Sequence, residues 1–423
     1  MMQFLENKSI LLSRLNNGRF LAQSEYNRVE NIIASVQDDG DKGLRKFTLE
    51  FDGISLKNIQ VPEKILLENS VLKNKDLHEA ITQAAENIRL FHEKQMPSGF
   101  HLTQPDGTHV TFNWRPIGRV GIYIPGGNYP LLSTVLMNVI PAQVAGVKEI
   151  IVCTPPQKNG SPDPAILNVC ELLGINEIYQ VGGAQAIAAM ALGTQSIPKV
   201  DKITGPGNRY VNAAKYLLSN RVGIDMIAGP TELIVVADET ANPNFIAADL
   251  ISQAEHDVDA MTLLLCPDQT IINNTMNKIE CLLKQTDTKM MAEKSLRNNG
   301  FILKTESINE CISISNQIAP EHLSLHLNNP EKVQHQFIAG VIFLGQQTPV
   351  AWGDYWAGPN HTLPTSGTAT FRGLLTVFDF LVPFSTIEAN ISRENKGHVI
   401  SMANGEGLSG HALSVKTRGM NHD

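Results

Sequence analysis

From residue 118 onward, short apolar runs alternate with helical stretches, and this alternation constrains the fold more than any other feature of the sequence. Strands and helices that alternate at this spacing are typical of βαβ units with a parallel sheet. The first series of expected strands covers 120–124, 149–153, 177–181, 200–204 and 223–227, with helices over 131–145, 165–173, 184–192 and 210–219. A second series follows Gly229 and Pro230, with strands over 233–237, 261–266, 301–304, 323–327 and 340–344 and helices over 244–254, 271–284 and 308–318. The sequence therefore predicts an α/β fold with two Rossmann-like parallel-sheet units.

The length of the chain sets the number of domains. At ~100–200 residues per domain, the 423 residues predict two to four domains. Residues 20–100 have the apolar spacing of helices, with Asp38, Asp39 and Gly40 as a connection. We expect a helical N-terminal arm over 1–25, a first α/β domain from 26–119 and 230–372, a second α/β domain over 120–229, and a small helical tail domain over 373–423.

The composition is that of a soluble globular protein. Hydrophobic residues make up 42% of the chain and charged residues 18%, which excludes the disordered and collagen-like classes. The formal charge is −8 and no block of like charge stands out, so a nucleic-acid or anionic-membrane surface is disfavoured. The segment MMQFLENKSI lacks a basic region followed by an apolar core, and we expect no signal peptide.

The cysteines indicate a reducing compartment. They are odd in number, widely spaced and without a CxxC motif, which fits neither a disulfide framework nor a cysteine zinc ribbon. Their positions are Cys153, Cys170, Cys266, Cys281 and Cys311. We expect a cytoplasmic protein.

Two long uncharged stretches raise the question of a membrane span. Residues 120–147 carry no charge over 28 positions, and residues 178–198 carry none either. The first stretch holds three prolines and the second three glycines and three glutamines, which would break a spanning helix or bury unsatisfied amides. We interpret both as buried strand and helix pairs of the α/β core.

Gln253 and His256 form the first candidate site. They lie three residues apart at the end of the helix expected from about 244, so an amide oxygen and an imidazole share one face and can meet one ion. Taken alone, a polar helix end with a histidine at its C-terminal dipole is the simpler interpretation.

Glu321 and His322 form the second candidate site, directly before the apolar strand 323–327. A carboxylic acid beside an imidazole at the mouth of a buried strand suits general acid/base chemistry, because burial and a neighbouring charge tune either pKa toward neutrality. A surface pair at a strand start explains the pattern equally well.

The segment 346–368 is a third candidate. It carries three prolines and three glycines with little periodicity, and loops of this length inside a compact domain are often functional. Asp354 and His361 are potential ligands within it. A structural Ω-loop is the alternative, and the prolines and the nearby Trp352, Tyr355 and Trp356 favour a rigid site loop.

A fourth candidate lies close to the C-terminus. The segment from Asn404 to His411 matches the pattern GxGxxG through Gly405, Gly407 and Gly410. A dinucleotide fingerprint needs a following helix and an acidic residue ~20 positions on, and only 13 residues follow Gly410, so the match is false. What remains is a surface tail or a segment that presents Glu406 and His411.

Glycine-rich turns follow three of the expected strands. They are Gly126-Gly127, Gly182-Gly183 and Gly205-Pro-Gly207. Each lies at the carboxyl end of a strand and opens a helix, where free N–H groups attract phosphate. A single turn of this kind is a weak signal, but three in neighbouring βα units favour a nucleotide crevice.

Taken together, these motifs resemble the histidinol dehydrogenase family. The resemblance runs from about Arg115 to His411 and includes IYIPGG, GGAQAIA, GPGN, AGPTE, SQAEHD, APEHL, GDYWAGPNHTLPTSG and EGLSGH in the order of the family. The family is a zinc enzyme that makes L-histidine from L-histidinol through L-histidinaldehyde, in two NAD-dependent oxidations. The resemblance implies that the first α/β domain forms the substrate and zinc side and the second the NAD side.

The resemblance also implies the role of each site residue. The expected zinc ligands are Gln253, His256, Asp354 and His411, one ion per subunit, and they also lie around the substrate. His322 matches the general base and Glu321 the residue that activates water. Thr231, His361 and Glu406 match further substrate contacts, with Thr231 where the family usually has serine. Tyr123, Gln185 and Asn208 match the residues that touch NAD.

The resemblance further implies a homodimer with shared active sites, in which the tail domain is swapped into the partner. Three alternatives stay open. One is a related zinc and NAD dehydrogenase for another amino or polyol alcohol. Another is a cysteine-dependent aldehyde dehydrogenase, for which Cys153 and Cys266 would be the nucleophiles. The third is a scaffold that binds metal or nucleotide without turnover.

Overall fold

The structure is a computed structural model that describes residues 2–5, 23–68, 74–126 and 129–418. The helical arm expected over 1–25 lies outside these residues except at its two ends. The chain divides into two compact units. Unit 1 comprises Met1–Gln95 and Ile117–Phe380, and unit 2 comprises Met96–Pro116 and Leu381–Asp423. Unit 1 contains two parallel sheets, so the predicted α/β class with two parallel-sheet units is confirmed.

The first sheet of unit 1 has five strands in the order β6-β5-β4-β7-β8, all paired in parallel. Its strands are β4 (Arg119–Tyr123), β5 (Glu149–Cys153), β6 (Glu177–Tyr179), β7 (Lys202–Thr204) and β8 (Gly223–Ile224). The helices between them are α6 (Leu132–Val144), α7 (Pro164–Leu172), α8 (Gly183–Leu192) and α9 (Arg209–Leu218). Each of these elements overlaps an expected one.

The second sheet has six strands in the order β1-β11-β10-β9-β12-β13, again all parallel. Its strands are β1 (Gln3–Leu5), β9 (Glu232–Ala237), β10 (Met261–Cys266), β11 (Gly300–Lys304), β12 (His322–His326) and β13 (Val341–Leu344). The helices are α10 (Pro243–Ala254), α11 (Gln269–Leu282), α12 (Lys289–Asn299) and α13 (Ile308–Ile318). The sequence pattern does not predict β1 and α12, whereas the other elements were expected.

Burial on both faces explains the continuous apolar runs. Every residue of β9 and β10 is buried. Alternate residues of β9 enter two separate apolar clusters, with Leu233 and Val235 on one face and Ile234 and Val236 on the other. A parallel sheet covered by helices on both faces requires this composition.

Helices α2 (Gln23–Asp39) and α3 (Asp41–Asp52) join at Gly40, whose φ of 55° lies in the left-handed region that glycine tolerates. The connection predicted at this position is confirmed.

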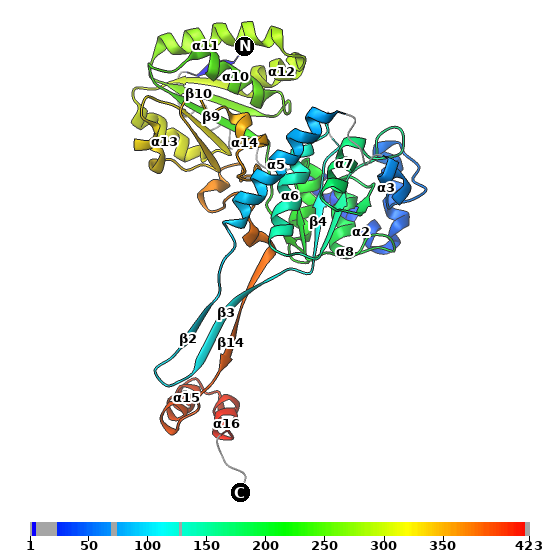
Figure 1. Ribbon diagram of the computed structural model, residues 1–423, viewed down its shortest axis with the longest axis vertical. Coiled ribbons are helices and arrows are strands. Elements are labelled where there is room, and N and C mark those ends of the chain that lie inside the picture. The colour runs from blue at the N-terminus through cyan, green and yellow to red at the C-terminus, as the bar shows by residue number, and fades with distance from the viewer. Residues whose placement is uncertain (1, 6–22, 69–73, 127–128, 419–423) are drawn as a thin grey trace. The chain divides into compact units, whose positions relative to one another are not determined.

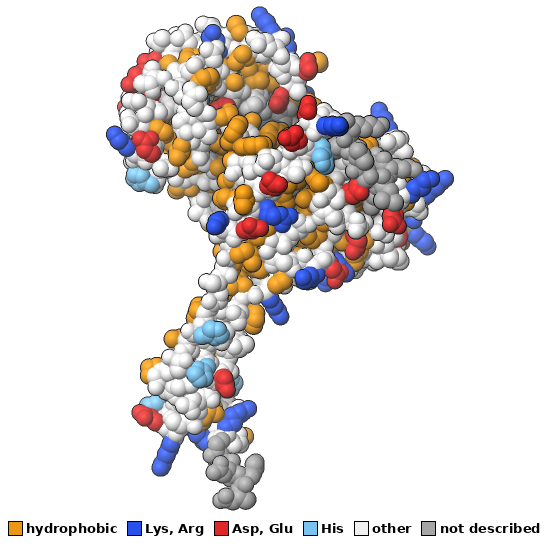
Figure 2. Space-filling view, viewed as in Figure 1, with side chains coloured by type: hydrophobic (Ala, Val, Ile, Leu, Met, Phe, Trp, Pro, Cys, Tyr) orange, Lys and Arg blue, Asp and Glu red, His pale blue; other side chains and the backbone are white. Residues whose placement is uncertain are grey.

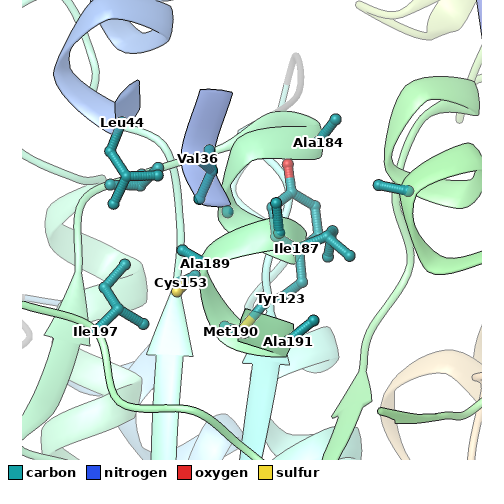
Figure 3. Packing of buried hydrophobic residues seen from close by; sticks show 14 of the residues in the cluster. Val36, Leu44, Tyr123, Cys153, Ala184, Ile187, Ala189, Met190, Ala191 and Ile197 are labelled. Atoms are coloured by element: carbon teal, nitrogen blue, oxygen red, sulfur yellow. The ribbon is translucent and has the colours of Figure 1, made fainter. Parts of the chain in front are cut away.

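The helices near the N-terminus pack against the five-stranded sheet. The sequence pattern groups 26–119 with the six-stranded sheet, whereas in the structure Val36 and Leu44 pack in the cluster around α8 of the five-stranded sheet. Figure 3 shows this cluster, with α8 lying between them and Tyr123 of β4. Helices α4 (Glu63–Glu68) and α5 (Lys75–Glu93) complete this part of the chain.

Unit 2 contains an antiparallel sheet in the order β14-β3-β2 (Figure 1). Its strands are β2 (Phe100–Thr103), β3 (His109–Pro116) and β14 (Leu381–Glu388), and α15 (Arg393–Gly405) and α16 (Ser409–Lys416) follow. The helical character expected for the tail is correct for α15 and α16. The strands were not expected, because β14 pairs with a segment far away in the sequence and no local pattern reports that pairing.

The uncharged stretches form β4 with α6 and β6 with α8. No helix among the described residues is both long and apolar enough to cross a membrane.

Candidate active site

Thr231 and Glu321 lie at the amino ends of two neighbouring strands. Thr231 precedes β9 and Glu321 precedes β12, and these strands pair in parallel with Leu233 opposite His322. Helix α10 connects the parallel strands β9 and β10, so it runs back toward their amino ends. Gln253, in its last turn, therefore lies at the same edge of the sheet.

The hydroxyl group of Thr231 joins Gln253 to Glu321. Thr231 Oγ1 donates to Glu321 Oε2 at 2.5 Å, and the backbone N–H of Glu232 donates to the same oxygen at 2.9 Å. Gln253 Nε2 donates to Thr231 Oγ1. Because the single hydroxyl proton of Thr231 goes to the carboxylate, its oxygen must accept from the amide. The amide of Gln253 is thereby oriented with Nε2 toward Thr231 and Oε1 on its other branch.

A backbone carbonyl fixes the tautomer of His322. His322 Nδ1 lies 3.1 Å from the carbonyl oxygen of Glu232 and 3.5 Å from Glu321 Oε2. Both oxygens act as acceptors, so Nδ1 carries a proton. In the neutral imidazole Nε2 is then the basic nitrogen. The ring also stacks on Phe343, with centroids 6.1 Å apart.

Burial and the mutual charge of Glu321 and His322 act in opposite directions on their pKa values. Burial alone lowers the pKa of His322, but the adjacent Glu321 carboxylate outweighs it and, with the charge of Asp354, raises the pKa to about 9. Burial alone raises the pKa of Glu321, but the His322 charge and the hydrogen bonds from His322, Thr231 and Glu232 hold the pKa below its ordinary value. The carboxylate of Glu321 and the imidazole of His322 therefore each favour the charged form of the other.

The loop after β13 brings Asp354 and His361 to this cluster. Asp354 belongs to the short helix α14 (Val350–Tyr355) and is half-buried. Burial lowers the pKa of His361, and the charge of Asp354 opposes this effect. His361 Nε2 lies 3.2 Å from Ser133 Oγ of α6. The loop thus lies beside the pair of Glu321 and His322 and, through His361, contacts α6 of the other sheet.

A second buried acid–imidazole pair holds α14 against α10. Asp249 Oδ2 lies 3.3 Å from His326 Nε2, and Asp249 Oδ1 accepts from the backbone N–H of Val350 at 3.4 Å. Asp249 lies one helical turn before Gln253 on α10, and Val350 begins the helix that carries Asp354. Asp249 therefore fixes the spacing between two of the expected zinc ligands.

His256 lies outside the helix that was expected to carry it. Helix α10 ends at Ala254, so His256 follows the helix and is exposed, whereas Gln253 is buried. No group of three or more His, Cys, Asp or Glu side chains within the described ranges is arranged to hold a metal ion.

Glu406 and His411 belong to unit 2. Glu406 is the C-cap residue of α15 and His411 lies in the first turn of α16. Both side chains are exposed.

The three residues expected at NAD lie at the carboxyl edge of the five-stranded sheet. Tyr123 ends β4, and its hydroxyl oxygen accepts from the backbone N–H of Gly183 at 3.0 Å. Figure 3 shows this hydroxyl group at the first turn of α8. Gln185 Oε1 is buried and has no hydrogen-bond partner among the described residues. Asn208 caps α9 by accepting from the N–H groups of Tyr210 and Val211.

Comparison with known proteins agrees with this geometry. The family model described as histidinol dehydrogenase matches residues 18–419. The histidinol dehydrogenase of Bacillus cereus is 42% identical over 422 residues, which cover 98% of this chain and 97% of that one. The chain belongs to the histidinol dehydrogenase family. It is therefore an oxidoreductase of that family.

Solved structures give the same result. The crystal structure of histidinol dehydrogenase from Elizabethkingia anophelis superposes with a TM-score of 0.91 at 39% identity and covers 99% of this chain and 98% of that one. An acetylating aldehyde dehydrogenase from Geobacillus thermoglucosidasius shares the fold with a TM-score of 0.52 at 14% identity, covering 92% and 99% of the two chains. The two parallel-sheet units are thus also found in an aldehyde dehydrogenase fold.

The cysteines are poorly suited to nucleophilic catalysis. Cys153 and Cys266 are fully buried. Burial raises the pKa of Cys266 to about 12 and raises the pKa of Cys153 further still. A nucleophilic cysteine needs an accessible thiolate. This argues against the cysteine-dependent alternative.

Glu232 is a site residue that the sequence reasoning missed. Its carbonyl oxygen holds His322, and its carboxylate accepts from the N–H groups of Ser366 at 3.1 Å and Glu321 at 3.4 Å. Glu232 is the last residue of the motif AGPTE and directly follows Thr231. An acidic side chain at the start of an otherwise apolar strand is the sequence feature that could have identified Glu232 as a site residue.

Proposed function

We propose that the chain oxidises L-histidinol to L-histidine through L-histidinaldehyde, in two successive NAD-dependent steps at one zinc site per subunit. The observation that supports this most is the tautomer of His322, which leaves Nε2 as the basic nitrogen beside the buried Glu321. NAD would accept the hydride in both steps, and zinc would hold the imidazole and amine of the substrate.

In the first oxidation His322 acts as the general base. Nε2 takes the proton of the alcohol hydroxyl, while the carbon that bears this hydroxyl loses a hydride. The proton on Nδ1 stays with the Glu232 carbonyl and the Glu321 carboxylate, which stabilise the imidazolium that forms. The Glu321 carboxylate thus stabilises His322 while it keeps its hydrogen bonds from Thr231 and Glu232.

In the second oxidation Glu321 activates water. Oε2 is held by Thr231 and Glu232, so the carboxylate is oriented before substrate binds. The carboxylate takes a proton from water, whose oxygen adds to the aldehyde carbon, and the second hydride then leaves that carbon. Two adjacent acid/base groups therefore serve both half-reactions at one site.

The chemistry of the implied ligands suits a zinc ion, and two of them lie beside the pair of Glu321 and His322. The amide of Gln253 is oriented by Thr231, which leaves Oε1 as the donor toward an ion. Asp354 supplies a carboxylate near enough to raise the pKa of His322. His256 and His411 would complete two oxygen and two nitrogen donors, a set that zinc accepts. We propose that the ion orients the substrate rather than generating hydroxide.

We propose that NAD binds at the glycine turns of the five-stranded sheet. These turns open helices, and the N–H groups there attract phosphate. Gln185 Oε1 is a buried acceptor without a partner among the described residues, and a donor from the cofactor would satisfy it. Tyr123 precedes one of these turns, and Asn208 ends another.

We propose a homodimer with shared sites, in which Glu406 and His411 of unit 2 serve the site of the partner. Unit 2 exposes large apolar side chains, among them Phe100, Ile387, Met402 and Leu413, the last three between 60% and 73% exposed. Figure 2 shows hydrophobic side chains on the surface of this unit. Exposed apolar surface of this kind marks a protein interface. We propose that the tail domain, residues 373–423, is swapped into the partner, where it supplies Glu406 and His411.

The test of substrate and metal is an assay of NADH formation with purified protein. L-histidinol should be oxidised, activity should be lost after chelation, and zinc should restore it. Other amino alcohols and polyols serve as controls for the alternative substrate class. Turnover of one of these without turnover of histidinol at high enzyme concentration would contradict the proposal.

A further inference from the structure

A buried ion pair lies directly behind the glycine turn that follows β7. The side chains of Lys215 and Asp225 are 2% and 1% exposed, and Lys215 Nζ lies 2.7 Å from Asp225 Oδ1. Lys215 belongs to α9, and Asp225 follows β8. Because removal of either partner leaves an uncompensated buried charge, each residue holds the other in place.

The pair binds both polar groups of Gly205. Asp225 Oδ2 accepts from the N–H of Gly205 at 2.8 Å, and Lys215 Nζ donates to the carbonyl oxygen of Gly205 at 2.6 Å. Gly205 has a φ of 110°, and a Cβ atom there would lie 2.0 Å from the carbonyl oxygen of Tyr123. The turn is thus held in a conformation that only glycine adopts, packed against a residue expected to touch NAD.

The same region is tied to the segment that leads to Thr231. Asn212 Nδ2 donates to the carbonyl oxygens of Gly207 at 3.0 Å and Ala228 at 2.7 Å. The N–H of Ala228 donates back to Asn212 Oδ1 at 3.2 Å. Arg372 donates to the carbonyl oxygen of Asp225 at 3.0 Å. The turn and the segment 225–229 therefore form one hydrogen-bonded network.

We propose that Lys215 and Asp225 are positioning residues that hold the turn 205–208 in the conformation that receives NAD. This inference rests on the proposed NAD-dependent function. Neither side chain is accessible, so the pair acts through Gly205 and through Asn208 at the start of α9. Its loss should weaken the binding of NAD and change histidinol binding and zinc content far less, because the hydrogen bonds that join Thr231 to Gln253 and Glu321 do not include the pair.

The test is calorimetric titration of the full-length zinc enzyme with NAD and, separately, with histidinol. Lys215→Met removes the donor to Gly205 and should raise the Kd for NAD about tenfold or more. Lys202→Met is the matched control, because Lys202 pairs with Asp379 at 2.8 Å from the opposite end of β7. The control should bind NAD as the wild type does.

A second variant separates positioning from stability. Lys215→Met combined with Asp225→Asn removes both charges, so no buried charge is left unpaired, and the amide oxygen of the new side chain can still accept from the N–H of Gly205. This double variant should melt cooperatively and still bind NAD about tenfold more weakly.

Two results would overturn the proposed role of Lys215 and Asp225. Wild-type affinity for NAD in a folded variant overturns the inference, as does an equal loss of NAD and histidinol binding. A wild-type protein that binds no NAD overturns the proposed cofactor as well.

Discussion

His322 Nδ1 lies 3.1 Å from the backbone carbonyl oxygen of Glu232. A carbonyl oxygen only accepts, so this contact determines which nitrogen of the ring is basic. The contact comes from the pairing of β9 with β12, which puts the backbone of one strand opposite the first residue of the other. The sheet itself thereby orients the proposed base.

The rate of the first oxidation should depend on the charge of His322. The base acts when neutral, and the pKa of His322 is raised from 6.5 to about 9. We therefore expect the single-turnover rate of the first oxidation to increase with pH across this range. Glu321→Gln removes the charge that raises the pKa and should lower the midpoint by about one pH unit or more. Single-turnover NADH formation at each pH measures this, and an unchanged midpoint would show that Glu321 does not tune the base.

The same pair should stabilise the metal-free chain in a defined pH window. The pKa of His322 is higher in the folded chain than in the unfolded one, so its stabilisation is complete below pH 6.5 and is lost as the pH rises toward about 9. Urea unfolding of chelated wild type and His322→Asn should differ by about 1–3 kcal/mol at pH 6. The difference should shrink by pH 9. A difference that grows with pH would contradict the ion pair.

Replacing Thr231 should separate the role of its hydroxyl group from that of its shape. Thr231→Val breaks the link between Gln253 and Glu321 and should lower kcat/KM about a hundredfold, with weaker zinc binding. Thr231→Ser keeps the hydroxyl group and should stay within about threefold of the wild type. Zinc titration and steady-state assays measure both effects. Equal activity of the two variants would contradict the proposal that the Thr231 hydroxyl group orients the amide of Gln253.

Mixing two inactive variants tests the shared site. His322→Asn lacks the base, and His411→Asn lacks the ligand expected from the partner. A mixed dimer contains one complete site if the tail is swapped, so refolding an equal mixture should restore roughly a quarter of wild-type activity. His322→Asn refolded alone is the control. If each tail serves its own chain, the mixture stays as inactive as the separate variants.

The cysteines should be dispensable. Cys153→Ala and Cys266→Ala should retain wild-type kcat for each folded enzyme, because both thiols are buried with raised pKa values. A loss of stability of about 1 kcal/mol is expected from the smaller side chain. Activity per folded molecule is the measurement, and its disappearance in either variant would support thiol chemistry.

The local pattern of the sequence predicts the two parallel sheets well, because buried strands and helices leave distinct periods in the chain. β5, β10 and α13 have the bounds that were expected. The antiparallel sheet of unit 2 was not predicted, since β3 and β14 are far apart in the sequence and pair through the backbone.

In the candidate site, too, the sequence predicts some residues and misses others. Gln253, Glu321 and His322 are visible as polar residues at the ends of apolar elements. The roles of Glu232 and Lys215 are not visible, because one acts through its carbonyl oxygen and the other through a buried contact with Gly205. Such contacts depend on the pairing of elements and leave no mark in composition or spacing.

The most direct test of the account is the amount of NADH formed from a limiting quantity of L-histidinol with excess NAD. Two oxidations at one site predict two NADH for each histidinol consumed and L-histidine as the product in equal amount to the substrate. One NADH for each histidinol, with the aldehyde accumulating, would contradict the proposed role of Glu321 in the second step.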